Sequence, residues 1–184
     1  MKSTAVFWGE MAPSEHLVHI YEDDDVFLDT LEGFVVDGLR MGEGVVVIAS
    51  AAHLSSLNRR LTKHSANIVR GMHSDQYLSL NAEAMLSLFM VDGWPDEQRF
   101  NSFVTGILSR ARVGGRRVRA FGEMVAILWA QGNSGATVAL EHLWTDLCES
   151  QDFMLFCAYP KCGFTCDAEQ SIRNICDTHS RVIA

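Results

Sequence analysis

The stretch Val45-Val46-Val47-Ile48-Ala49 is an uninterrupted apolar run in which β-branched side chains dominate. A strand with one solvent-exposed face alternates apolar and polar side chains, whereas a strand covered on both faces is apolar throughout. This run therefore predicts a central strand of a parallel sheet that has helices packed on both of its faces.

Patterns typical of strands and helices alternate on both sides of this run. The further predicted strands cover residues 17–21, 77–80, 117–122 and 153–159. Apolar residues at helical spacing predict helices over residues 26–39, 51–64, 82–90, 125–129, 136–147 and 168–178. Residues 92–95 form a turn pattern, and Pro95 is placed to begin another helix, whose apolar stripe runs to Ala111.

Strands that alternate with helices in this way build βαβ units. The sequence thus predicts an α/β fold of three layers. A mostly parallel sheet of about five or more strands would lie between two layers of helices.

The chain has 184 residues and a formal charge of −8. Domains usually contain roughly 100–200 residues, so we expect one domain over residues 16–184, after an irregular segment over residues 1–15. The acidic balance disfavours direct binding of nucleic acid, which requires clustered Lys and Arg side chains. We interpret the one dense basic cluster, Arg116, Arg117 and Arg119, as a solvated edge.

The sequence shows neither a secretory signal peptide nor an apolar run of about 18 residues. We therefore expect a cytoplasmic protein that does not enter a membrane. In that compartment its five cysteines would be reduced thiols.

The spacing of possible metal ligands matches no familiar site. Cys162 and Cys166 have one residue too many between them for a redox motif. His16 and His19 are three residues apart in a predicted strand, so their side chains would face opposite sides of the sheet. Cys157 lies inside a predicted strand and is interpreted as an inert, buried thiol. We expect no metal and no cofactor.

Residues at the ends of the predicted strands supply most of the candidate site. Ligands of parallel α/β sheets bind beyond the carboxyl ends of the strands. The turn that contains Trp94 is expected near the same end. The candidate ligand-binding residues are Tyr21, Glu22, Ser50, Trp94, Glu123 and Tyr159. None of them is assigned a catalytic role.

The first strand-to-helix turn argues against a nucleotide. A nucleotide-binding α/β domain normally has glycines there, so that backbone N–H groups and the helix N-terminus hold phosphate. This chain has Tyr-Glu-Asp-Asp-Asp at residues 21–25, and these carboxylates would repel a triphosphate. The sequence contains no G-x-x-x-x-G-K-[ST], G-x-G-x-x-G or G-x-S-x-G motif.

Two interpretations stay open for the main candidates. Glu123 ends an apolar strand, where it could act on a ligand or a water, or it could serve only to begin the next helix. Tyr21 and Tyr159 each offer a ligand an apolar face and a hydroxyl, but tyrosines at strand ends also close cores.

Four segments, in this order, resemble the MEDS family, the sensory domain named after the dichloromethane regulator DcmR. They are residues 16–23 (HLVHIYED), 89–96 (FMVDGWPD), 117–124 (RVRAFGEM) and 157–160 (CAYP). The resemblance extends over nearly the whole chain and implies a RecA/KaiC-like core that lacks the nucleotide-binding loop. The family's motif positions include Tyr21, Glu22, Glu123 and Tyr159.

The function that this resemblance implies is a non-catalytic sensory domain that binds a small, apolar molecule at the strand ends. The sequence contains no kinase or helix-turn-helix pattern, so we expect output through a separate signalling protein, such as a histidine kinase or a transcription regulator, or through a homo-oligomer. One alternative is a degenerate RecA-like nucleotide-binding protein, a residual ATPase with Glu123 as the base. The other is an interaction module that binds no ligand.

Overall fold

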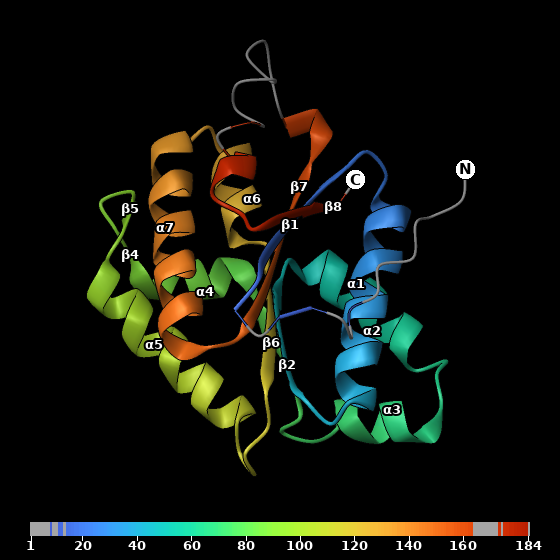
Figure 1. The fold of residues 1–184 in the computed structure, drawn as a ribbon. Helices are drawn as coiled ribbons and strands as arrows, with labels where there is room; N and C mark the ends of the chain where they lie inside the picture. The colour runs from blue at the N-terminus through green and yellow to red at the C-terminus, as the bar shows by residue number, and fades with distance from the viewer. Residues whose placement is uncertain (1–7, 9–10, 13, 164–172, 174, 184) are drawn as a thin grey trace.

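The computed structural model describes residues 8, 11–12, 14–163, 173 and 175–183. A six-stranded sheet in the order β3-β2-β6-β7-β1-β8 forms the middle layer (Figure 1). Every neighbouring pair in this sheet is parallel. Its strands are β1 (His16–Tyr21), β2 (Gly44–Ala49), β3 (Tyr77–Asn81), β6 (Val118–Gly122), β7 (Met154–Pro160) and β8 (Arg181–Ile183). The predicted α/β class and parallel sheet are confirmed.

Helices cover both faces of the sheet, as predicted (Figure 1). One layer consists of α1 (Asp24–Arg40), α2 (Ala51–Leu61) and α3 (Ala66–Met72). The other consists of α4 (Ala82–Phe89), α5 (Glu97–Ala111), α6 (Met124–Ala130) and α7 (Ser134–Gln151). In the part of the chain that the structure describes, no helix is both long and apolar enough to cross a membrane.

The run that predicted the fold is completely buried. All six residues of β2 are buried. Val46 and Ile48 belong to the core beneath α4–α7, whereas Val45 and Val47 belong to the core beneath α1–α3. Consecutive side chains thus enter different layers, which is why no polar residue interrupts the run.

The structure corrects the prediction around Pro95. Met90–Val91 (β4) and Trp94–Pro95 (β5) form a small antiparallel hairpin in which Pro95 pairs with Met90. The next helix begins at Glu97, because the Asp96 side chain caps it by accepting the Arg99 N–H at 2.8 Å. A turn was therefore predicted correctly, but Pro95 does not begin the helix.

Two other elements were not predicted, the short helix α3 and the edge strand β8. The predicted segment over residues 1–15 and the predicted helix over residues 168–178 lie largely outside the described residues. Within that predicted helix, residues 175–177 are helical. A 3-10 turn over Lys161–Gly163 follows β7.

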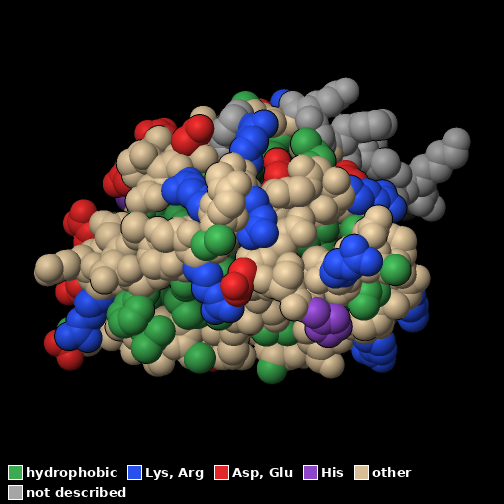
Figure 2. Space-filling view, turned by 90° about the horizontal axis from the view of Figure 1, so that it is seen from below, with side chains coloured by type: hydrophobic (Ala, Val, Ile, Leu, Met, Phe, Trp, Pro, Cys, Tyr) green, Lys and Arg blue, Asp and Glu red, His purple; other side chains and the backbone are tan. Residues whose placement is uncertain are grey.

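Arg119 contradicts the expectation of a solvated arginine edge. Its side chain is 1% exposed and forms an ion pair with Glu43, which is itself buried. Its Nη1 donates to the Phe34 carbonyl at 2.9 Å, and the guanidinium lies 5.1 Å from the centre of the Phe34 ring. The partners that make burial possible come from distant parts of the chain. At the lower end of the molecule, basic side chains form several separate groups rather than one patch (Figure 2).

Replacing Arg119 with Met should strongly destabilise the fold, because it leaves the buried Glu43 carboxylate without its cation. We expect Arg119→Met to lower the free energy of unfolding by about 3–5 kcal/mol. Arg110→Met is the matched control, because Arg110 forms an exposed ion pair with Asp75. Arg110→Met should lower the free energy of unfolding by only about 0–1 kcal/mol. Urea denaturation measures both, and equal losses would contradict the role given to burial.

Candidate functional site

The candidate site lies at the ends of two neighbouring strands, β2 and β6, from which the chain continues to opposite faces of the sheet. The helix after β2 packs on one face of the sheet, and the helix after the neighbouring β6 packs on the other. Such a divergence opens a crevice at the carboxyl ends of parallel strands, where ligands of α/β proteins bind. Ser50 and Glu123 stand directly after these two strands.

Glu123 joins the ends of the two strands. Its backbone N–H donates to the Ile48 carbonyl at 2.9 Å, and its side chain is largely buried. Oε2 accepts the backbone N–H of Ser50 at 2.8 Å, and Oε1 accepts Nδ1–H of His53 at 2.8 Å. Glu123 does begin α6, but its side chain makes no capping hydrogen bond there. The carboxylate therefore faces the candidate site, and helix initiation alone does not account for it.

Ser50 and His53 form the first turn of α2. The Ser50 side chain caps this helix by accepting the His53 N–H at 3.4 Å. The N-terminus of a helix carries a partial positive charge, which the Glu123 carboxylate neutralises here. The hydrogen bond from His53 to Glu123 raises the pKa of the imidazole above its ordinary value of 6.5.

Aromatic side chains continue this group toward β1. The rings of Tyr21 and Phe27 stack with their centres 4.6 Å apart, and Phe27 meets the His53 ring edge-on at 5.0 Å. Burial, together with the nearby Glu123 and Asp24 carboxylates, raises the pKa of Tyr21, so its phenol stays protonated. We name Tyr21, Phe27, Ser50, His53 and Glu123 the strand-end cluster.

Of the predicted site residues, Tyr21, Ser50 and Glu123 come together in this cluster, and the other candidates lie elsewhere. Glu22 points into solvent and forms an ion pair with Lys161, whose hydrogen bond lowers the pKa of the carboxyl. Trp94 is 56% exposed and covers Gly135 in the first turn of α7.

Tyr159 faces the opposite side of the sheet from Tyr21. Tyr159 is opposite Ile20 in the register of β7 and β1, and Tyr21 is opposite Pro160, so the two tyrosines point into different layers. The Tyr159 side chain is completely buried, and its hydroxyl donates to Oε1 of Glu141 in α7. Tyr159 therefore packs in the core beneath α4–α7 and does not share a ligand site with Tyr21.

Tyr159 belongs to a second polar group, between the sheet and α7. Here His16, Glu141, Cys157 and His179 place one ligand-type atom each within 4.8 Å of one another. We name these four residues the His-Cys-Glu cluster. Among the described residues, they are the ones arranged to hold a metal ion.

Burial disfavours the charged form of every residue in the His-Cys-Glu cluster. It lowers the pKa of His16 to about 2 and that of His179 to about 4. It raises the pKa of Glu141 to about 7 and holds the pKa of the Cys157 thiol well above its usual value.

The two N-terminal histidines do face opposite layers, as predicted. His16 Nδ1 lies 3.1 Å from Thr145 Oγ1 of α7, whereas the His19 ring lies 5.9 Å from that of Tyr21. The sequence interpretation missed the partners that other elements bring to His16. Glu141 lies in the middle of α7 and His179 just before β8, and no local motif connects them.

The family model for MEDS, the methanogen/methylotroph, DcmR sensory domain, matches residues 15–180. The chain belongs to the MEDS family. No curated protein and no solved structure matches it significantly. MEDS is a sensory-domain family, so membership supports a sensory role and confirms the resemblance found in the sequence. The matched range contains both the strand-end cluster and the His-Cys-Glu cluster of this MEDS domain.

The hydrogen bond between His53 and Glu123 predicts a specific pH dependence of stability. Because the folded-state pKa of His53 is raised, its contribution is complete below pH 6.5 and is lost as the pH rises through that folded-state pKa. We expect Glu123→Gln to return the His53 pKa toward 6.5 and to remove this part of the pH dependence.

Histidine NMR titration gives the His53 pKa, and urea denaturation at about pH 6 and about pH 9 gives the stability difference. His53→Gln should remove the same pH-dependent part as Glu123→Gln. The exposed His73 serves as the control, since His73→Gln should leave both measurements unchanged. An unchanged His53 pKa in Glu123→Gln would contradict the assignment.

Proposed function

We propose that this MEDS domain is a non-catalytic sensor, acting in the cytoplasm, that binds a small molecule at the strand-end cluster and signals through a separate protein. The observation that carries the proposal is the largely buried Glu123 carboxylate at the divergence of β2 and β6, bonded to Ser50 and His53 and continued by aromatic rings.

The chemistry of the cluster favours a ligand with an apolar body and one hydrogen-bonding group. Tyr21 and Phe27 offer aromatic surface, whereas Glu123, His53 and the Tyr21 hydroxyl offer acceptors and donors. Ligand sites typically combine such apolar surface with a few placed polar groups. Small hydrocarbon derivatives that carry a hydroxyl, amine or halogen fit this description.

The same geometry argues against the ATPase alternative. Phosphate binds helix N-termini through free backbone N–H groups. At the start of α1, the backbone N–H groups of Asp25 and Val26 already donate to the side chain of Asp23. The N–H of Ser50 at the start of α2 is accepted by Glu123. A phosphate at either helix would have to displace a carboxylate of the protein.

Signalling requires that the ligand bind two states of the domain with different affinity. A ligand that competes for Glu123 would release Ser50 and His53, and with them the start of α2. The outer face of α2 carries Arg60, which forms ion pairs with Asp25 and Asp29 of α1. A shift of α2 would change this charged surface, to which a histidine kinase or a regulator would bind.

A thermal-shift screen of short-chain alcohols, alkyl amines and halogenated hydrocarbons tests the proposal. A ligand that binds only the folded state raises the midpoint in a concentration-dependent way. We expect at least one compound class to stabilise the domain, and Glu123→Gln and Tyr21→Phe to weaken its binding by about tenfold, which corresponds to about 1.4 kcal/mol.

Glu22→Gln is the matched control, because Glu22 is an exposed carboxylate in the same turn as Tyr21. It should leave binding unchanged. Equal weakening by Glu22→Gln and Glu123→Gln would refute the strand-end site. Stabilisation by a nucleotide alone would favour the ATPase alternative, and no stabilisation by any compound would favour the interaction module.

A further inference from the structure

We propose that His16, Glu141, Cys157 and His179 bind one divalent cation of the zinc type between the sheet and α7. This site is independent of the strand-end cluster and goes beyond the proposed function. The four residues come from β1, α7, β7 and the segment before β8. An ion there would therefore connect parts of the chain that are far apart in the sequence.

The distances among the ligand atoms fit a tetrahedral ion. Zinc bonds of roughly 2.0–2.3 Å place neighbouring ligand atoms about 3.3–3.6 Å apart. His16 Nε2 lies 3.5 Å from Glu141 Oε2 and 3.4 Å from Cys157 Sγ. His179 Nε2 lies 3.6 Å from the same Glu141 oxygen, and Cys157 Sγ lies 4.0 Å from it. These four of the six edges, with all ligand atoms within 4.8 Å of one another, describe a slightly expanded tetrahedron.

Hydrogen bonds at the outer nitrogens orient both imidazoles for metal binding. The Ile175 carbonyl lies 2.6 Å from His179 Nδ1 and can only accept, so that nitrogen carries the proton. The Thr145 hydroxyl donates to the Glu141 carbonyl at 3.0 Å and therefore accepts from His16 Nδ1. Both Nε2 atoms consequently present lone pairs toward the cluster. Metal-binding histidines are commonly held by their other nitrogen in this way.

The carboxylate is positioned in the same manner. The Tyr159 hydroxyl donates to Oε1 of Glu141, which leaves Oε2 as the oxygen that faces both histidines and Cys157. His16, His179 and Glu141 thus each have a hydrogen-bond partner that fixes the orientation of the side chain. A zinc ion with one thiolate, one carboxylate and two neutral imidazoles makes an electrically neutral group, which suits a buried site.

Hydrogen bonding within the protein does not satisfy the cluster. His16 Nε2 can accept from the Cys157 thiol, but His179 Nε2 is buried and has no hydrogen-bond partner. The His179 side chain is 0% exposed in this structure, so its Nε2 is not at the protein surface. A buried polar atom without a partner is costly and calls for a specific explanation. Coordination of a metal ion by this nitrogen supplies one.

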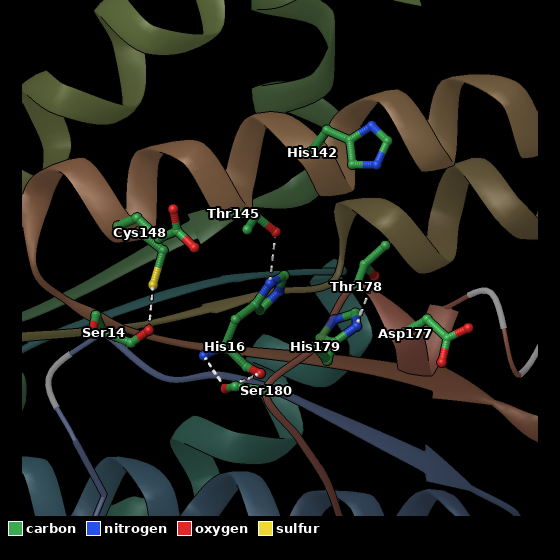
Figure 3. A pocket seen from close by; sticks show the side chains of 10 residues that line it. Ser14, His16, His142, Thr145, Cys148, Asp177, Thr178, His179 and Ser180 are labelled. Carbon is green, nitrogen blue, oxygen red and sulfur yellow. Dashed lines mark hydrogen bonds between the residues drawn. The ribbon is translucent and has the colours of Figure 1, made fainter.

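A surface pocket borders the cluster on the side of its two histidines. The pocket has a volume of about 460 Å³, and His16, Thr145 and His179 are among the residues that line it. Figure 3 shows the rings of His16 and His179 side by side between β1 and α7, with Asp177 and His142 farther to the right in this view. On binding, the Cys157 thiol and any protonated Glu141 carboxyl release their protons to the solvent.

Metal analysis of the full chain, purified without a polyhistidine tag or chelator, tests the proposal first. We expect about one zinc ion per chain. The chelator-treated protein is then titrated with Co²⁺, which should produce the visible bands of tetrahedral cobalt together with a thiolate-to-cobalt charge-transfer band.

Variants assign the ligands. Cys157→Ser should abolish the charge-transfer band, and His179→Gln should reduce zinc content and cobalt affinity. Thr145→Val removes only the hydroxyl that holds His16, so the fold should persist while metal affinity falls by roughly 10–100-fold. His142→Gln, in the same pocket, and His19→Gln, on the other face of β1, are the matched controls and should bind normally.

Absence of zinc, together with no cobalt spectrum at micromolar protein, would overturn the proposal. So would cobalt bands without a thiolate contribution, or equal loss in the control variants. The result of the metal-binding test does not depend on that of the thermal-shift screen, because Glu123→Gln should leave metal content unchanged.

Discussion

Each strand of a sheet that is covered on both faces must send consecutive side chains into opposite layers. In β1 this alternation directs His16 toward α7 and directs Tyr21 toward α1. The parallel register of β1 with β7 then places Cys157 and Tyr159 in the α7 layer with His16. The strand-end cluster and the His-Cys-Glu cluster therefore share one strand and yet lie on different sides of the sheet.

Carboxylates of the protein occupy positions that α/β nucleotide-binding proteins use for phosphate. Asp23 accepts the first N–H groups of α1, and Glu123 accepts the N–H that begins α2. Both interactions neutralise a helix N-terminus without an external anion. This substitution explains how the architecture keeps its helices in place although the sequence contains no phosphate-binding loop. It also places a carboxyl group and an imidazole, those of Glu123 and His53, at the carboxyl ends of β2 and β6.

Long patterns in the sequence predicted the layers, because burial on two faces or along one helix stripe leaves a signal over many residues. The edge strand β8 leaves none, since its three residues include the exposed Val182 and exist as a strand only through pairing with β1. Arg119 was misread for a related reason. Arginine favours solvent on average, and only the distant Glu43 and Phe34 make its burial possible.

The candidate site was predictable to the extent that strand ends define it. Tyr21, Ser50 and Glu123 follow from the positions where β1, β2 and β6 end. Tyr159 also ends a strand, but the face to which it points depends on the register of β7 with β1. Glu141 and His179 carry no local signal, because the order of strands in the sheet and the packing of α7 make them neighbours of His16. Contacts set by topology are not visible in spacing along the chain.

The helices that carry the two clusters differ in how much they bury, and this difference favours α2 as the part that moves. Only Leu57 and Leu61 of α2 are buried, whereas α1 buries eight residues and α7, which carries Glu141, buries seven. The start of α2 is held instead by polar bonds from Ser50 and His53 to Glu123, which a ligand can exchange for its own. A metal ion at the His-Cys-Glu cluster would fix β1, β7 and α7 to one another on the far face. If the proposed ligand binds at the strand-end cluster, we expect it to displace α2 rather than deform the sheet, because the less firmly packed element moves at the lower cost in free energy.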